Sequence, residues 1–160
     1  MKAIQLQVAQ IVPCTEAEGP GKRFALWFQG CPLRCPGCCN PEYLPFKGGT
    51  TRAVDEIANE IRESREQTGI EGITLLGGEP FAHAEPAAAL AAEARNLGLS
   101  VMVFSGYTIE HLRTTIDPHA AAGIGDGPSS AATEVDPELL EHRRRSEVRC
   151  DDVADPCILQ

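Results

Sequence analysis

Two short apolar runs constrain the fold more than any other feature of the sequence. They occupy residues 72–76 (GITLL) and 99–104 (LSVMVF), and a glycine lies within two residues of both ends of each run. Apolar runs of this length, rich in β-branched residues, are typical of strands that are buried on both faces of a parallel sheet. We therefore expect these two runs to be neighbouring central strands.

A helical pattern precedes each of the two runs. One helix is expected over 52–67, with Thr51 as its N-cap and Gly69 at its end, because its apolar residues form a single stripe. A second helix is expected over 85–96, where alanine and leucine dominate and Gly98 stops the pattern. Strands that are joined through helices in this way form a parallel sheet with right-handed crossovers.

The N-terminal part supplies two further strands. Residues 4–12 alternate, residues 23–28 (RFALWF) are largely apolar, and loops are expected over 13–21, up to Asn40 and over 45–50. With a last helix beginning at 108–114, the predicted fold class is α/β, as a partial (βα) barrel or an open parallel sheet.

Three polar motifs follow the strands that begin at residues 23, 72 and 99. They are the cysteine-rich loop 31–40, the GGEP turn 77–80 and the turn 105–107. Because the carboxyl ends of parallel strands share one edge of a sheet, ligands bind at that edge. We therefore expect all three motifs to gather there.

The cysteine-rich loop carries the strongest chemical signal. Cys31, Cys35 and Cys38 place three thiols within eight residues, whereas a structural zinc site needs four closed ligands, often as paired C-x2-C units. Three thiolates leave one iron of a cubane cluster open to a further ligand, so the spacing favours a [4Fe-4S] cluster. A zinc site with Cys14 or Cys39 as fourth ligand is the alternative.

The other two motifs are weaker when taken alone. A turn that ends a strand explains both of them, while glycines at Gly77 and Gly78 would also let the backbone approach an amino-acid ligand closely. Ser105 in the next turn would then contact a ribose or a substrate. The four histidines are scattered along the chain and are expected to face solvent; they are His83, His111, His119 and His142.

Composition excludes several classes of protein. A net charge of -9 argues against a nucleic-acid binder, no apolar run reaches the length of a membrane span, and no signal-peptide pattern is present. We therefore expect a cytoplasmic protein whose seven cysteines serve metal or redox chemistry. Residues 1–50 nevertheless carry a net charge of +2, by chance or because Lys22, Arg23, Arg34 and Lys47 serve an anionic cofactor or an acidic partner.

Together, the motifs resemble the radical S-adenosylmethionine (SAM) superfamily. More narrowly, the sequence is similar to the activating proteins of anaerobic ribonucleotide reductase, over about residues 4–116. The segments that carry the similarity are 15–42 (TEAEGPGKRFALWFQGCPLRCPGCCNPE), 75–80 (LLGGEP) and 103–108 (VFSGYT). The resemblance implies a fold of the radical SAM type and a glycyl-radical activase.

The resemblance also implies roles for individual residues. Cys31, Cys35 and Cys38 would hold the [4Fe-4S] cluster, and the open iron would chelate SAM. The backbone around Gly37, Cys38 and Cys39 would face the adenine. The methionine moiety would lie against the turn of Gly77, Gly78, Glu79 and Pro80, with Ser105 as a further contact.

The same resemblance implies the reaction and the partners. A reduced flavodoxin or ferredoxin would supply one electron, and SAM would be cleaved to a 5′-deoxyadenosyl radical. That radical would abstract a hydrogen atom from a glycine of a partner such as an anaerobic ribonucleotide reductase. Neither nucleic acid nor a membrane is implied.

Two alternatives remain open at the level of sequence. A radical SAM enzyme that acts on a small molecule or peptide, such as a deazaguanine synthase, shares the loop region but typically has Asp-Thr after its third cysteine, where this chain has Cys39-Asn40. A non-catalytic iron–sulfur or zinc protein is favoured by the C-terminal part, where the apolar pattern fails. We therefore expect a cluster-binding domain over 1–118 and a divergent, weakly ordered tail over 119–160.

Overall fold

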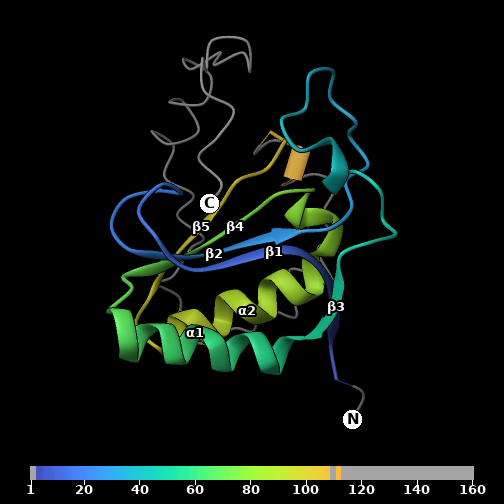
Figure 1. Ribbon diagram of the computed structural model, residues 1–160. Coiled ribbons are helices and arrows are strands. Elements are labelled where there is room, and N and C mark those ends of the chain that lie inside the picture. Colours follow the sequence, from blue (N-terminus) through green and yellow to red (C-terminus); the bar gives the residue numbers. More distant parts are fainter. Residues whose placement is uncertain (1–2, 109–110, 113–160) are drawn as a thin grey trace. The chain divides into compact units, whose positions relative to one another are not determined.

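The structure is a computed structural model that describes residues 3–108, 111 and 112 (Figure 1). Met1–Gly106 form one compact unit, whose fold is given below. Most of the helix expected from 108 and the whole of the tail expected over 119–160 lie outside the described residues, so the boundary at residue 118 stays a prediction. No helix in the described part of the chain is long and apolar enough to cross a membrane.

Five strands form one mixed, open sheet in the order β3-β1-β2-β4-β5. The strands are β1 (Gln5–Thr15), β2 (Arg23–Phe28), β3 (Thr50–Ala53), β4 (Gly72–Leu76) and β5 (Ser100–Val103). β2, β4 and β5 run parallel, with Arg23 opposite Gly72 and Gly72 opposite Ser100. The α/β class and the parallel arrangement from residue 23 onward are therefore confirmed, while the described strands do not close into a barrel.

The sheet is not parallel throughout, because β1 runs antiparallel to both of its neighbours, β2 and β3. Only seven residues, 16–22, connect β1 to β2. A parallel connection needs a crossover of about a dozen residues or more, so this short link requires an antiparallel pair.

The prediction that Thr51 caps the first helix is wrong. Residues 50–53 form strand β3 instead, where Thr51 lies opposite Gln7 and its hydroxyl accepts a 2.8 Å hydrogen bond from Gln7 Nε2. Helix α1 (Val54–Thr68) begins after Ala53, whose backbone N–H donates to the Glu56 carboxylate at 3.3 Å. It ends, as predicted, at Gly69, which adopts a left-handed conformation with φ of 68°.

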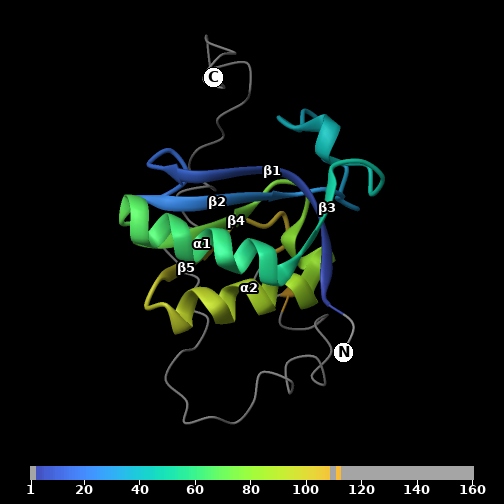
Figure 2. The same cartoon turned by 60° about the horizontal axis from the view of Figure 1, so that its bottom comes forward.

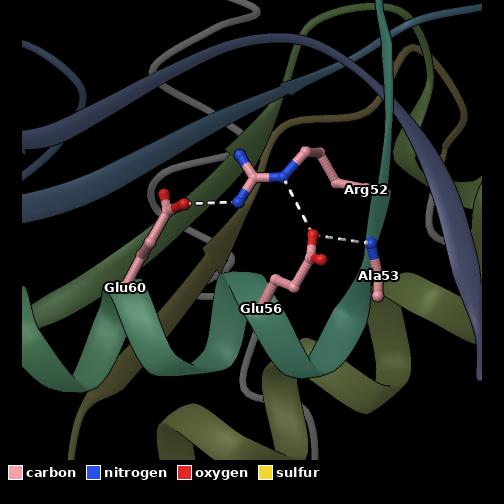
Figure 3. Close-up of polar contacts among 4 residues, drawn as sticks. All are labelled: Arg52, Ala53, Glu56 and Glu60. Atoms are coloured by element: carbon pink, nitrogen blue, oxygen red, sulfur yellow. Dashed lines mark hydrogen bonds and ion pairs between the residues drawn. The ribbon is translucent and has the colours of Figure 1, made fainter.

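Arg52 supports the start of α1 from the end of β3 (Figure 3). Its guanidinium donates to Glu56 Oε2 at 3.1 Å and to Glu60 Oε1 at 2.5 Å, one and two turns into the helix. These hydrogen bonds raise the pKa of Arg52. The bond from Arg52, followed by the one from the Ala53 N–H, lowers the pKa of Glu56.

Both helices cover the same face of the sheet, as Figures 1 and 2 show. Helix α2 (Ala84–Asn96) follows a short 3-10 helix, η2 (Pro80–His83), and packs beside α1. The main core lies between these helices and the sheet and includes Phe24, Leu26, Phe28, Ile57, Ile61, Ile73, Leu75 and Leu90. We call this side of the sheet the helix face.

The opposite face of the sheet carries a smaller apolar cluster. Ala25, Trp27 and Leu76 are buried there, and Ala9, Val12, Tyr43 and Phe104 pack against them. We call this side the open face. At the start of the parallel strands, the link between β1 and β2 folds over it, because Thr74 Oγ1 donates to the carbonyl of Glu18 at 2.8 Å.

Candidate functional site

The candidate site begins where β2 ends, at Gln29-Gly30-Cys31. Cys31 is buried, with 6% of its surface exposed, and its N–H donates to the carbonyl of Leu44 at 3.0 Å. The N–H of Gly30 donates to the carbonyl of Tyr43 at 2.8 Å. The chain therefore leaves β2, makes the cysteine loop and returns alongside the residues from which it started.

Gln29 fastens this returning segment. Its side chain is buried and Nε2 donates to the carbonyls of Glu42 (3.0 Å) and Pro45 (2.7 Å). The short 3-10 helix η1 (Pro41–Tyr43) lies inside the fastened segment. Sequence reasoning missed this role of Gln29, since its partners are backbone carbonyls 13 and 16 residues away and carry no residue-type signal.

The tip of the loop is exposed and tightly turned. Cys35 is exposed and Cys38 is half-buried, and the N–H of Cys38 donates to the carbonyl of Cys35 at 3.3 Å. Arg34 and Gly37 have positive φ values of 47° and 70°, and no atom of the described residues lies within 4 Å of where a Gly37 side chain would begin. Cys39, the next residue of the tip, is exposed and is disulfide-bonded.

The donor set fits an iron–sulfur cluster in its chemistry. Cys31, Cys35 and Cys38 are all free thiols. As they stand, no three His, Cys, Asp or Glu side chains of the described residues are grouped closely enough to hold a metal ion. Cys31 at the end of β2 and Cys35 and Cys38 at the tip are the residues that would hold a cluster, and metal binding is commonly coupled to local folding.

Cys14 does not belong to this site. It lies near the end of β1, where Val12 is opposite Ala25 and Thr15 is opposite Arg23, so it is at the starting edge of β2. There it packs against the main core, whereas Cys31 follows the other end of β2. The zinc alternative with Cys14 as fourth ligand is therefore wrong.

The GGEP turn lies directly against the end of β2. A Cβ on Gly78 would be 2.5 Å from the carbonyl oxygen of Phe28 and 2.6 Å from that of Gly30, and one on Gly77 would collide with the side chain of Trp27. Both glycines also have positive φ, 63° and 53°. Close packing between two strand ends thus requires both glycines, whatever ligand they contact.

Glu79 joins the three motifs. Its N–H donates to the carbonyl of Gly30 at 3.0 Å, which connects the GGEP turn to the cysteine loop. Its carboxylate, with 1% of the residue exposed, accepts hydrogen bonds from Ser105 Oγ and from the N–H of Gly106, both at 2.9 Å. It also accepts one from the N–H of Phe81 at 3.0 Å.

The cysteine loop also reaches the turn after β5. A Cβ on Gly106 would be 2.4 Å from Cδ1 of Leu33, so the Leu33 side chain lies against this glycine. The three motifs therefore gather at one edge of the sheet, and this prediction is confirmed. Pro80 is buried at the start of η2.

Arg23 does not serve an anionic cofactor. It is buried at the start of β2, where its guanidinium donates to Thr74 Oγ1 (2.6 Å), to the carbonyl of Ile73 (2.6 Å) and to Ser100 Oγ (3.0 Å). Burial lowers the pKa of Arg23, partly offset by Glu71. Arg23 therefore holds β2, β4 and β5 together at the edge opposite the cysteines, whereas Arg34 is exposed on the cysteine loop and Lys47 is exposed on the returning segment.

His83 does not simply face solvent, contrary to the prediction. It is half-buried, and its ring stacks on Phe28 with a centroid distance of 5.4 Å and an interplanar angle of 16°. Its other neighbour is Phe46, at 5.9 Å. Its Nε2 is buried and has no hydrogen-bond partner in the part of the chain that the structure describes. Long-range ring contacts of this kind leave no sequence signal.

Known proteins are similar to this chain in sequence. The family described as "4Fe-4S single cluster domain" matches residues 17–124, more than half of the chain. The chain belongs to that family. The anaerobic ribonucleoside-triphosphate reductase-activating protein of Escherichia coli K12 is 30% identical over 111 residues, which are 64% of this chain and 70% of that protein. The predicted resemblance to radical SAM activases is thereby confirmed.

Two further relatives are matched over shorter stretches. The protein of the same name from Enterobacteria phage T4 is 36% identical over 75 residues, 45% of this chain and 46% of that protein. The pyruvate formate-lyase-activating enzyme of Listeria monocytogenes is 38% identical over 66 residues, 40% of this chain and 27% of that enzyme. The chain thus spans about a quarter of the latter's length.

Proposed function

We propose that this chain is a radical SAM enzyme that installs a glycyl radical on a partner protein such as an anaerobic ribonucleotide reductase. The observation that carries the proposal is the joining of three strand-end motifs through Glu79, which bonds to Gly30 and to Gly106. Membership of a [4Fe-4S] family and relatives that are named as activating enzymes support it. The cytoplasm is the compartment we propose.

Cys31, Cys35 and Cys38 would hold the cluster, with Cys31 as the fixed ligand. When bound, the cluster and SAM together supply a one-electron reductive cleavage that yields methionine and a 5′-deoxyadenosyl radical. The chain's own part is to position the cluster and SAM and to exclude water from the site. Gly77, Gly78, Glu79, Pro80 and Ser105 would border the methionine end of SAM, and the backbone at Gly37, Cys38 and Cys39 would border its adenine.

Anaerobic reconstitution tests the proposal. After loading with iron and sulfide, the chain should hold about four irons and, with SAM and dithionite, release 5′-deoxyadenosine and methionine. Cys31→Ala should abolish iron binding, and Cys14→Ala is the matched control that should retain it. Tight binding of one zinc ion, or SAM that stays intact under prolonged reduction, would refute the assignment.

The partner requires a separate measurement. Mixing the loaded chain with an anaerobic ribonucleotide reductase or with pyruvate formate-lyase should give the electron paramagnetic resonance signal of a glycyl radical on one of them. We propose a reduced flavodoxin or ferredoxin as the electron donor in this reaction. Cleavage of SAM without a radical on either protein would favour a small-molecule substrate instead.

A further inference from the structure

We propose that the aromatic rim around Phe46 is the docking surface for a small acidic one-electron carrier protein. The rim consists of Phe46 and Lys47 on the returning segment, and the cysteine loop that precedes this segment carries a second exposed cation, Arg34. The inference rests on the proposed function, because only a redox centre needs a reductant. It adds the surface to which that reductant binds.

Phe46 is unusual among the described residues. Among these residues it is the one large apolar side chain that is exposed, at 49%. Its ring is nevertheless held in place, because a Cβ on Gly30 would be 2.5 Å from Phe46 Cδ1 and the His83 ring lies beside it. An exposed aromatic ring that is already ordered is the type of side chain that dominates binding energy in protein interfaces.

The rim is next to the first cysteine. Phe46 lies on Gly30, the residue before Cys31, and the N–H of Cys31 is bonded to Leu44, two residues before Phe46. The segment projects from the edge of the sheet in Figures 1 and 2. A protein that covers Phe46 therefore lies against the backbone that carries the fixed ligand of the proposed cluster.

Phe46 lies on the helix face of this edge. It contacts His83, which stacks on Phe28, and Phe28 belongs to the core under the helices. The GGEP turn instead begins on the open face, where Gly77 meets Trp27. The proposed SAM site and the rim thus approach the edge from different faces. A carrier on the rim would therefore approach the edge from the helix face and not from the face on which the GGEP turn begins.

The charge of the segment selects the kind of carrier. Residues 29–50 hold two basic residues, Arg34 and Lys47, and one acidic residue, Glu42, a net of +1. Since the whole chain carries -9, the remainder carries -10. An acidic partner is therefore attracted to this segment and repelled by the net negative charge of the rest of the chain, which steers its approach. Docking itself forms no bond, and the single electron that the carrier loses is the one that the bound cluster gains.

Binding of a flavodoxin and of an acidic ferredoxin to the full reconstituted chain tests the proposal by titration calorimetry. Phe46→Ala should raise the dissociation constant about tenfold or more, because an interface aromatic is lost. Lys47→Gln should raise it about two- to fivefold at low ionic strength, and salt should remove that effect. Lys22→Gln, an exposed lysine at the opposite edge, should leave binding unchanged.

A second measurement separates this inference from the proposed function. With dithionite in place of the carrier, Phe46→Ala and Lys47→Gln should cleave SAM within about twofold of the unaltered chain, whereas carrier-driven cleavage should fall. Unaltered carrier binding in both variants would overturn the proposal. So would a loss of glycyl radical formation alone, which would assign the rim to the radical acceptor. Failure of the unaltered chain to cleave SAM with dithionite would refute the proposed function, while the calorimetry would still decide the docking surface.

Discussion

The carboxylate of Glu79 accepts a 2.9 Å hydrogen bond from the backbone N–H of Gly106, which ties the turn after β4 to the turn after β5. The N–H of Glu79 is at the same time bonded to the carbonyl of Gly30, at the root of the cysteine loop. One residue therefore fixes three segments that are far apart in the sequence. The Glu79 carboxylate also accepts hydrogen bonds from Ser105 Oγ and from the N–H of Phe81. The first role of Glu79 is therefore to hold these segments in position.

Replacing Glu79 should loosen the whole edge. Glu79→Ala leaves the N–H groups of Phe81 and Gly106 and the hydroxyl of Ser105 without their carboxylate acceptor; the three hydrogen bonds are part-buried, and each loss costs about 1–3 kcal/mol. We expect a loss of unfolding free energy of about 3 kcal/mol or more and weaker retention of iron. Urea unfolding and iron analysis measure the two effects. Glu85→Ala, at an exposed position at the start of α2, is the control and should change neither.

The two glycines Gly78 and Gly37 should respond differently to alanine. Gly78→Ala places a methyl group 2.5 Å from the carbonyl oxygen of Phe28, so β4 and β2 must separate at the edge next to Cys31. We expect iron loading to fail in this variant. Gly37→Ala meets no atom of the described residues and costs the strain of its positive φ, about 1–2 kcal/mol, with iron retained. Equal iron content in both variants would contradict the packing role of Gly78.

Arg23 should matter for stability and not for chemistry. Arg23→Met removes a buried guanidinium that bonds to Thr74, Ile73 and Ser100. Hydrogen bonds to charged groups contribute about 1.5–3 kcal/mol each, and methionine recovers part of this by apolar burial. We expect a clearly lower melting temperature with unchanged iron content per folded chain. A stable variant that no longer binds SAM would instead return Arg23 to the role of an anion ligand.

The Arg52–Glu56 pair should give α1 a pH-dependent contribution. The pKa of Glu56 is lowered, so its charged form is favoured by folding. The contribution is therefore present above the usual carboxyl pKa and is lost as pH falls through the lowered pKa. The difference in unfolding free energy between the unaltered chain and Glu56→Gln should shrink accordingly in acid, as urea titrations at several pH values will show. Glu63→Gln, on the same helix and without a described ion pair, is the matched control.

Local patterns predicted the elements that carry their own signals. β2 and β4 occupy the predicted residues, 23–28 and 72–76, because apolar runs with a turn or glycine at each end are decisive on their own. β3 was missed because TTRA is polar and forms a strand only by pairing with β1, about 45 residues away. A threonine such as Thr51 is equally suitable as a helix cap, and here it lies in a strand because it pairs with Gln7.

In the candidate site, too, some features could be predicted from local patterns and others depend on distant contacts. The gathering of the three motifs followed from strand order alone. The contacts that hold them together did not, because Gln29, Leu33 and His83 act through backbone carbonyls, a glycine surface and ring stacking. None of these partners is encoded by a spacing in the sequence. Whether Glu79 and Ser105 contact SAM stays a prediction.

The Arg23 contacts have a consequence for how the protein responds to oxygen. They close the sheet at the edge opposite the cysteines, and the main core is built of aliphatic and aromatic side chains rather than of metal ligands. Oxygen that destroys a bound cluster would therefore abolish the activity, while the polypeptide would stay folded. We expect air-exposed protein to keep its circular dichroism spectrum and to regain four irons on anaerobic treatment with iron and sulfide. Damage of this kind would be reversible, and one polypeptide would serve through many rounds of cluster loss and repair.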